Sequence, residues 1–177
     1  MKLRNTLKVW VQKIREFLKP PPAEFSLTQQ LIITLGSTIT ICLLYGINYL
    51  LGKADILLLA PFIASALMIF TMPNNPMTSA TTMLQSYVLC ALISFAFVYV
   101  FEYSQWVLIA AFGICFFLML LLDCLHPPAI MLPFIIIGEQ MRDYSIAFNP
   151  ILIDVVILLI STYLFNKVLR RLPKVEK

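Results

Sequence analysis

The only histidine of the chain, His126, stands directly before two prolines, Pro127 and Pro128. The residue before a proline is pushed toward an extended conformation, and proline suits the first turn of a helix, so a helix is expected to start at Pro127. Because the prolines bring no N–H group, Ala129 and Ile130 supply the first backbone donors. Such a helix start favours an anion, and histidine adds a group that titrates near neutral pH. The alternatives are a structural histidine bonded to a loop carbonyl and a metal ligand.

Two aspartates are candidates for handling a proton at this site or for orienting the His126 ring. Asp123 lies three residues before His126, where it either orients the ring or ends a membrane span in water. Asp154 lies in an otherwise apolar segment, where an unpartnered acid costs about 2.5–3.5 kcal/mol at mid-membrane, which favours a functional role. Asp154 is also near a predicted helix start, where the helix dipole stabilises a carboxylate, so a structural role stays open.

The elements that position these groups are predicted to lie in a membrane. Of the 177 residues, 60% are hydrophobic and only 12% are charged, whereas soluble domains have roughly 25% charged residues. Of the 13 Lys and Arg residues, 6 lie in 1–19 and 5 in 167–177. An apolar body with basic flanks predicts a polytopic membrane protein and argues against nucleic-acid binding. The four cysteines lie in or beside apolar runs without a CxxC pair, which is typical of reduced hydrophobic side chains, with metal binding or disulfides as the alternative. No metal and no cofactor are expected.

Six apolar segments follow one another, at 26–51, 56–72, 79–102, 105–124, 127–138 and 150–168. A crossing needs roughly 20 residues, so the first, third, fourth and sixth segments are long enough, the second is marginal and the fifth is short. Both basic ends are expected in the cytoplasm, which requires an even number of crossings. The sequence therefore predicts an all-α transmembrane fold with six crossings. Five crossings with a re-entrant fifth segment is the alternative.

The segments divide into two halves, 26–102 and 105–168, each with a long span, a short proline-bounded segment and a final span. The short segment begins near Pro61 in the first half and at Pro127 in the second, and an Asn-Pro pair precedes each final span. Three segments per half invert the topology of one half relative to the other. Short interrupted segments at matching positions of inverted halves point to a transport site, although chance recurrence of Asn-Pro at helix starts is the alternative.

The flanks are assigned separately from the membrane domain, which is expected to be a single domain over 23–170. Residues 1–22 read as a basic amphipathic helix that lies on anionic lipid and stops at a run of three prolines, although a plain topogenic flank is equally compatible. Residues 171–177 form a basic cytoplasmic tail, and no cleavable signal peptide is evident. We expect an integral protein of a bacterial inner membrane with both termini cytoplasmic.

Two blocks of the sequence resemble a known family. His126–Ala129 resembles the signature of the HPP family of integral membrane proteins, and Pro61–Ser65 followed by the turn Pro73–Pro76 resembles its second block. The closing segment, from Asn149 to Lys167, is similar to the last helix of the family, and the resemblance covers roughly 55–170. Because some plastid and cyanobacterial members transport nitrite, the resemblance implies transport of a small anion.

The chain departs from the family pattern after the Pro-x-x-Pro turn. Where the family commonly has Gln-Pro-Arg and then Gly-Gly-His, this chain reads Ser79–Thr81 and Gln85–Tyr87, and the expected glycine of each half is replaced by Ile63 and Ile130. The lost cation and the lost second histidine weaken the case for nitrite in particular. Hydroxyl and amide groups in these stretches still offer donors to a small polar solute.

These observations lead to one functional prediction, a transporter or channel for a small inorganic anion that is homo-oligomeric and not an enzyme. The predicted substrate-binding residues are His126, Ala129, Ile130, Ser65, Gln85 and Thr81, with Asp123 and Asp154 as proton-handling or orienting residues. A non-transporting membrane scaffold or assembly subunit is the alternative. An intramembrane enzyme that uses His126 with Asp123 or Cys124 is a third hypothesis, for which a single histidine gives little basis.

Overall fold

The computed structural model describes residues 25–53 and 55–169, with side chains described as far as Lys167. The predicted amphipathic helix over 1–22 and the basic tail over 171–177 lie outside the described residues. The chain divides into two units, 1–30 and 31–177. In the first unit, the N–H of Ser26 donates to Oε1 of Gln29 at 2.9 Å, and the N–H of Gln29 donates to Oγ of Ser26 at 3.4 Å. This reciprocal pair is a capping box, which starts a helix. The second unit holds the rest.

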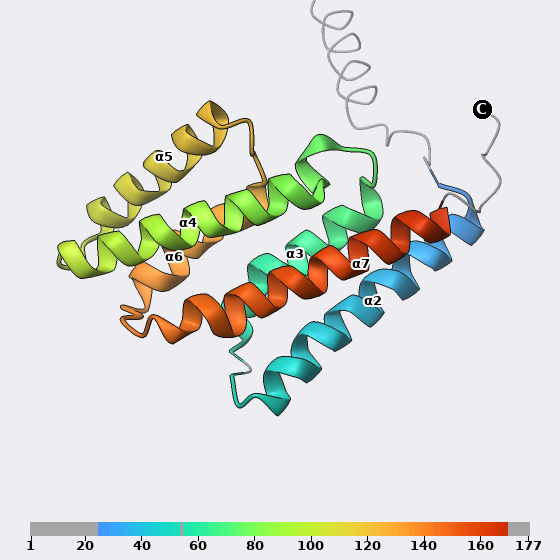
Figure 1. The fold of residues 1–177 in the computed structure, drawn as a ribbon, viewed down its shortest axis with the longest axis horizontal. Coiled ribbons are helices and arrows are strands. Elements are labelled where there is room, and N and C mark those ends of the chain that lie inside the picture. Colours follow the sequence, from blue (N-terminus) through green and yellow to red (C-terminus); the bar gives the residue numbers. More distant parts are fainter. Residues whose placement is uncertain (1–24, 54, 170–177) are drawn as a thin grey trace, which may run out of the picture. The chain divides into compact units, whose positions relative to one another are not determined.

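All regular structure among the described residues is helical, which confirms the predicted all-helical class (Figure 1). The elements are α2 (Leu27–Leu50), α3 (Ile56–Thr71), η1 (Pro76–Thr78), α4 (Ala80–Val100), α5 (Gln105–Leu121), η2 (Pro127–Ile130), α6 (Met131–Gly138), η3 (Ala147–Leu152) and α7 (Ile153–Leu169). In the described part of the chain, three helices are long and apolar enough to cross a membrane: Leu27–Leu50, Ala80–Val100 and Ala147–Lys167. The helices α3, α5 and η2–α6 are apolar but shorter.

Successive helices of the second unit run in alternating directions, so its connections gather at two ends (Figure 1). At one end, here called the turn end, the turn η1 lies against the segment that joins α5 to η2, and a hydrogen bond joins Met77 to His126. At the other, here called the loop end, Lys53 forms a salt bridge with Asp143, and the Tyr99 hydroxyl donates to the carbonyl of Arg142. These two ends are the reference for the site below.

Short polar side chains start several of the helices, and a left-handed residue follows the end of three of them, α2, α5 and α6. Asp55 caps α3, Ser79 caps α4 and Ser104 caps α5, each accepting from backbone N–H groups of the first turn. Because α3 begins at Ile56, the prediction that its segment starts near Pro61 is wrong, and Pro61 lies inside the helix. A carboxylate cap followed by five apolar residues is enough to begin the helix before the proline.

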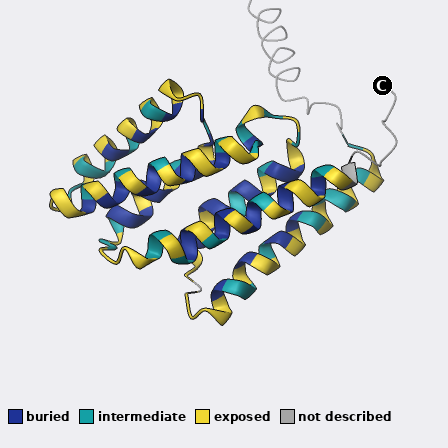
Figure 2. Ribbon diagram, viewed as in Figure 1, coloured by how far each residue is buried: buried dark blue, intermediate teal, exposed yellow. Residues whose placement is uncertain are grey.

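The core of the second unit lies between α3, α4, α6 and α7, which contact one another along their inner faces. Figure 2 shows buried residues on these inner faces and exposed residues on the outer ones. Many exposed residues are large and apolar, including Leu92 on α4 and Ile160 on α7, as expected of helices that face lipid. On α2, Gly36 lies directly against the ring of Phe70 from α3, which brings these two helices close together.

Candidate functional site

His126 is positioned by a break between α5 and η2 rather than by a continuous helix. The helix α5 ends at Leu121, and the chain then turns through Asp123, whose φ of 51° is left-handed. The N–H of Asp123 donates to Leu120 and that of Cys124 donates to Met119, which is the Schellman pattern of a helix end. The backbone is extended at His126 (φ −132°, ψ 96°), and the next helix starts at Pro127. The helix start predicted at Pro127 is therefore confirmed.

Both ring nitrogens of His126 are hydrogen-bonded inside the protein. Nδ1 lies 2.7 Å from the carbonyl oxygen of Met77 in η1, and Nε2 lies 2.7 Å from Oγ of Ser65 in α3. The hydroxyl of Tyr87 from α4 lies 2.7 Å from the same Oγ atom. The side chains of His126, Ser65 and Tyr87 have no exposed surface. These three side chains and the Met77 carbonyl are called the His126 network below.

Packing around the His126 network fixes the positions of its members. The ring of Tyr87 stacks on Phe62 at 4.6 Å between ring centroids, and its other neighbour is the His126 ring, at 5.7 Å. One residue before Tyr87, the hydroxyl of Ser86 donates to the carbonyl of Cys124 and so attaches the extended segment to α4. The network is therefore held by α3, α4, η1 and η2 together.

The hydrogen-bond donors and acceptors of the network fit two protonation states of His126. A carbonyl only accepts, so Nδ1 carries a proton, and in the neutral ring Nε2 accepts from Ser65, which in turn accepts from Tyr87. When Nε2 gains a proton it becomes the donor, and Ser65 directs its hydroxyl to the carbonyl of Pro61 at 3.0 Å. Rotation of one hydroxyl thus lets the site take up a proton without leaving any member unpaired.

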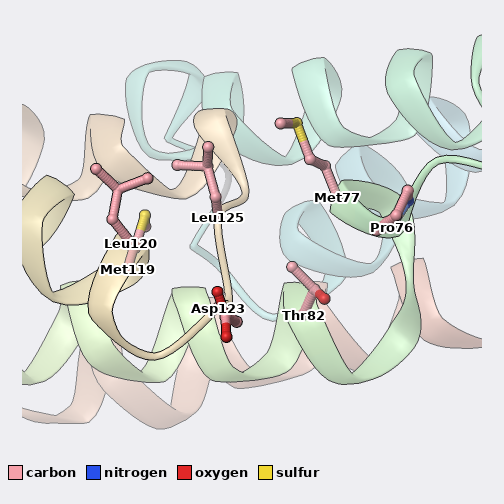
Figure 3. Close-up of a pocket in the computed structure, with 7 residues that line it drawn as sticks. All are labelled: Pro76, Met77, Thr82, Met119, Leu120, Asp123 and Leu125. Atoms are coloured by element: carbon pink, nitrogen blue, oxygen red, sulfur yellow. The ribbon is translucent and has the colours of Figure 1, made fainter.

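A cavity of about 190 Å³ lies at the turn end, directly beside the network (Figure 3). This volume is several times the roughly 30 Å³ that one water occupies in the liquid. Its wall includes Met77, whose carbonyl binds His126, and Leu125, the residue before His126. Thr82 of α4 and Asp123 add polar groups to the lining. The cavity therefore borders the His126 network at Met77.

The structure brings two of the predicted substrate-binding residues together and places the others elsewhere. Ser65 and His126 are hydrogen-bonded to each other. The N–H of Ala129 donates to the carbonyl of His126 at 3.1 Å, so the expectation that it is a free donor is wrong, because the first turn is a 3₁₀ turn that uses this group. Ile130 lies partly buried in the same turn. Gln85 and Thr81 are exposed on α4, and neither joins the network.

The two aspartates are not part of the network. Asp123 is exposed in the turn that ends α5, and the ring nitrogens of His126 bind Met77 and Ser65 instead of its carboxylate. Asp154 is fully buried on α7, where its Oδ1 accepts from the amide of Asn48 on α2 at 2.6 Å. Among the residues that the structure describes, no cluster of three or more His, Cys, Asp and Glu side chains is arranged to hold a metal ion.

Tyr87 is a possible donor from sequence, but it is not among the predicted substrate-binding residues, although the sequence holds a signal for it. The buried residues of α4 recur at spacings of three and four, at Met83, Tyr87, Cys90 and Ser94, so Tyr87 faces inward. Gln85 is not one of these buried residues, and its amide lies on the exposed face of the helix. Tyr87 also stands where the family pattern has its second histidine. The role of the Met77 carbonyl left no signal, because a backbone group is the same at every residue.

The comparisons with known proteins bear on the whole membrane domain. The family model for "HPP, transmembrane region" matches residues 22–173, which is most of the chain. No match was found among curated proteins or among solved structures. The match, together with the helices long enough to span a membrane, confirms the resemblance drawn from the two sequence blocks. The chain is an integral membrane protein that belongs to the HPP transmembrane family.

Proposed function

We propose that the protein transports a small inorganic anion across the membrane, with the His126 network as the binding site. The observation that carries this proposal is a fully buried histidine, bonded to Ser65 and Met77, at the start of a short helix inside an apolar bundle. Polar groups at such positions are costly in a membrane protein and usually line a solute pathway. When Nε2 is protonated, the ring offers a positive charge and a donor to an anion.

The origin of the network in both halves of the chain supports a transport role. Ser65 comes from the short helix α3 of the first half and His126 from the start of η2–α6 in the second half, and these short elements run in opposite directions (Figure 1). Transporters built from inverted halves bind their solute where such interrupted helices meet. In this proposal, all six segments cross the membrane, and both termini lie in the cytoplasm.

Cavities at both ends of the second unit support a transport pathway in which the central binding site is closed to solvent. At the loop end, a cavity of about 600 Å³ is lined by residues that include Lys53, Leu58 and Pro150. This cavity carries both a cation, Lys53, and a carboxylate, Asp55, whereas the charged group that lines the cavity at the turn end is the carboxylate of Asp123. The network between the elements has no exposed surface, so α3, α4 or η2 must move for a solute to reach it.

The direct test is flux through liposomes that contain only the purified protein. Uptake of nitrite, formate, nitrate and chloride is measured in proteoliposomes and in protein-free liposomes of the same lipid. We expect at least one small anion to enter the proteoliposomes faster and to saturate with concentration. Equal rates with and without protein for the whole panel would contradict transport and favour the scaffold alternative.

Two substitutions on one helix separate the site seen in the structure from the site expected from sequence. Tyr87→Phe removes the hydroxyl that bonds Ser65 while keeping the ring that stacks on Phe62. Since a hydrogen bond contributes about 0.5–1.5 kcal/mol net, we expect anion flux to fall about two- to tenfold. Gln85→Ala is the matched control, because Gln85 is exposed on the same helix, and its flux is expected to equal that of the wild type. The opposite pattern, with flux sensitive to Gln85 only, would place the pathway on the outer face of α4.

A further inference from the structure

A second buried polar site joins α2 to α7, apart from the His126 network. The amide nitrogen of Asn48 donates to the carbonyl of Leu44 at 2.8 Å and to Oδ1 of Asp154 at 2.6 Å. Both side chains have no exposed surface. Because these two bonds use both amide hydrogens of Asn48, its geometry and that of Asp154 are fixed, and the remaining oxygens of both groups point elsewhere.

The atoms left over at this site are all hydrogen-bond acceptors. Oδ1 of Asn48 and Oδ2 of Asp154 are buried and have no partner, and they belong to two groups already in contact. A third buried oxygen without a partner, Oδ1 of Asn149, lies one turn earlier in the chain, in the distorted turn before α7. The backbone of Asn149 is not helical (φ −139°, ψ 108°), so the carbonyls of that turn depart from the regular helical pattern. Buried acceptors without a donor are unfavourable unless something with positive charge binds them.

Among the residues that the structure describes, no basic side chain forms an ion pair with Asp154. The helices α2 and α3 contain no charged residue, and α4 presents only Tyr87 and Cys90 as buried titratable groups on its inner face. In the described part of the chain, the salt bridge of this end joins Lys53 to Asp143 at 3.9 Å, and both of those side chains are largely exposed. The start of α7 favours a carboxylate through the helix dipole, but this leaves Oδ2 without a bond.

We propose that Asn48 and Asp154 form a binding site for a small monovalent cation, Na⁺ or a proton. A single carboxylate with neutral amide oxygens balances one positive charge, and oxygen ligands suit Na⁺ as well as a proton. Broken helices of membrane transporters hold such cations with acidic side chains and irregular backbone carbonyls. The cavity at the loop end reaches Pro150, one turn before Asp154 on the chain, and gives a cation a route from that end. The site does not depend on which anion the protein carries.

Binding is tested with the purified protein in detergent, without any anion substrate and without flux. The melting temperature is measured in 0–150 mM NaCl, with choline chloride holding the ionic strength constant, and separately in choline chloride from pH 5.5 to pH 8.5. A ligand that binds only the folded state raises its stability, so Na⁺ is expected to raise the melting temperature by about 3 °C or more if it is the cation. If the cation is a proton, the melting temperature rises as the pH falls, because protonation removes a buried charge, and NaCl has no effect.

Two variants assign the response to this site. Asp154→Asn keeps the size of the side chain and removes the charge, so its melting temperature is expected to be insensitive to NaCl and flatter with pH. Asp143→Asn is the control, because it removes an exposed carboxylate at the same end and should respond as the wild type does. Radioactive Na⁺ binding to the wild type covers the case in which Asp154→Asn does not fold. A wild type that responds neither to Na⁺ nor to pH, or an Asp154→Asn variant that responds equally, would overturn the proposal.

Discussion

Replacing His126 with alanine is expected to reduce anion flux in proteoliposomes by about tenfold or more. The substitution removes both hydrogen bonds of the ring, so the Met77 carbonyl loses its histidine partner and the Ser65 hydroxyl keeps only Tyr87 and the Pro61 carbonyl. A hydrogen bond from the ring to a charged anion contributes about 1.5–3 kcal/mol, and 1.4 kcal/mol corresponds to a factor of ten. The variant also lacks the group that carries positive charge to an anion. Flux is measured at matched protein content, after size-exclusion chromatography has shown that the variant is monodisperse.

A second substitution at the same position separates a failure to fold from a failure to transport. In His126→Asn, the side-chain amide can still donate to the Met77 carbonyl, so η1 stays attached, but nothing replaces Nε2. We expect this variant to melt closer to the wild type than His126→Ala and to transport equally poorly. If His126→Asn transports at the wild-type rate, the histidine is structural, and the anion site lies elsewhere.

Gly36→Leu is expected to destabilise the protein through a clash between α2 and α3. A Cβ atom at Gly36 would lie 2.3 Å from Cε1 of Phe70, well inside contact distance. The Phe70 ring has little freedom to move aside, because it packs on Phe165 with ring centroids 4.3 Å apart. Overpacking costs about 1–3 kcal/mol, and each kcal/mol lowers the melting temperature of a protein of this size by about 2–4 °C. We therefore expect a decrease of about 2–12 °C, measured by thermal unfolding in detergent.

Gly46→Leu is the matched control on the same helix. A Cβ atom at Gly46 meets nothing within 4 Å, so the new side chain projects into open space. Its melting temperature is expected to stay within about 1 °C of the wild type, because substitutions on an exposed surface change stability little. Equal losses in the two variants would show that α2 does not depend on its contact with Phe70.

The helices were largely predictable because each carries its own start and stop signals. Apolar length and basic flanks gave the six segments, and their bounds agree with the helices to within a few residues. The failures came at prolines. Pro61 is predicted to begin a segment but lies inside α3, because Asp55 caps the helix six residues earlier. Asn149 was expected to precede a regular helix but lies in a distorted turn with a buried, unpartnered oxygen, unlike its counterpart Asn75, which caps η1.

Site residues were predictable only where the chemistry of the side chain and its position in the sequence both indicated the same residue. His126 stood out as the single histidine before a proline pair, and Ser65 lay on the matching short segment. The amide of Gln85 predicts a site residue, but the inward face of α4 contains Tyr87 and not Gln85. The partner of Asp154 was out of reach, because Asn48 lies 106 residues earlier, and only the packing of α2 on α7 brings the two together. Long-range pairs of this kind depend on tertiary geometry that local patterns do not contain.

The extended segment between α5 and η2 places two successive side chains in different surroundings. Successive residues of an extended chain point to opposite sides. Here Leu125 lines the cavity at the turn end (Figure 3), and His126 binds Ser65 and the Met77 carbonyl. A substitution at residue 125 can therefore change the size or polarity of this cavity while the adjacent imidazole keeps its bonds. Insertion of a single residue here, by contrast, would exchange the two sides and remove the imidazole from its partners.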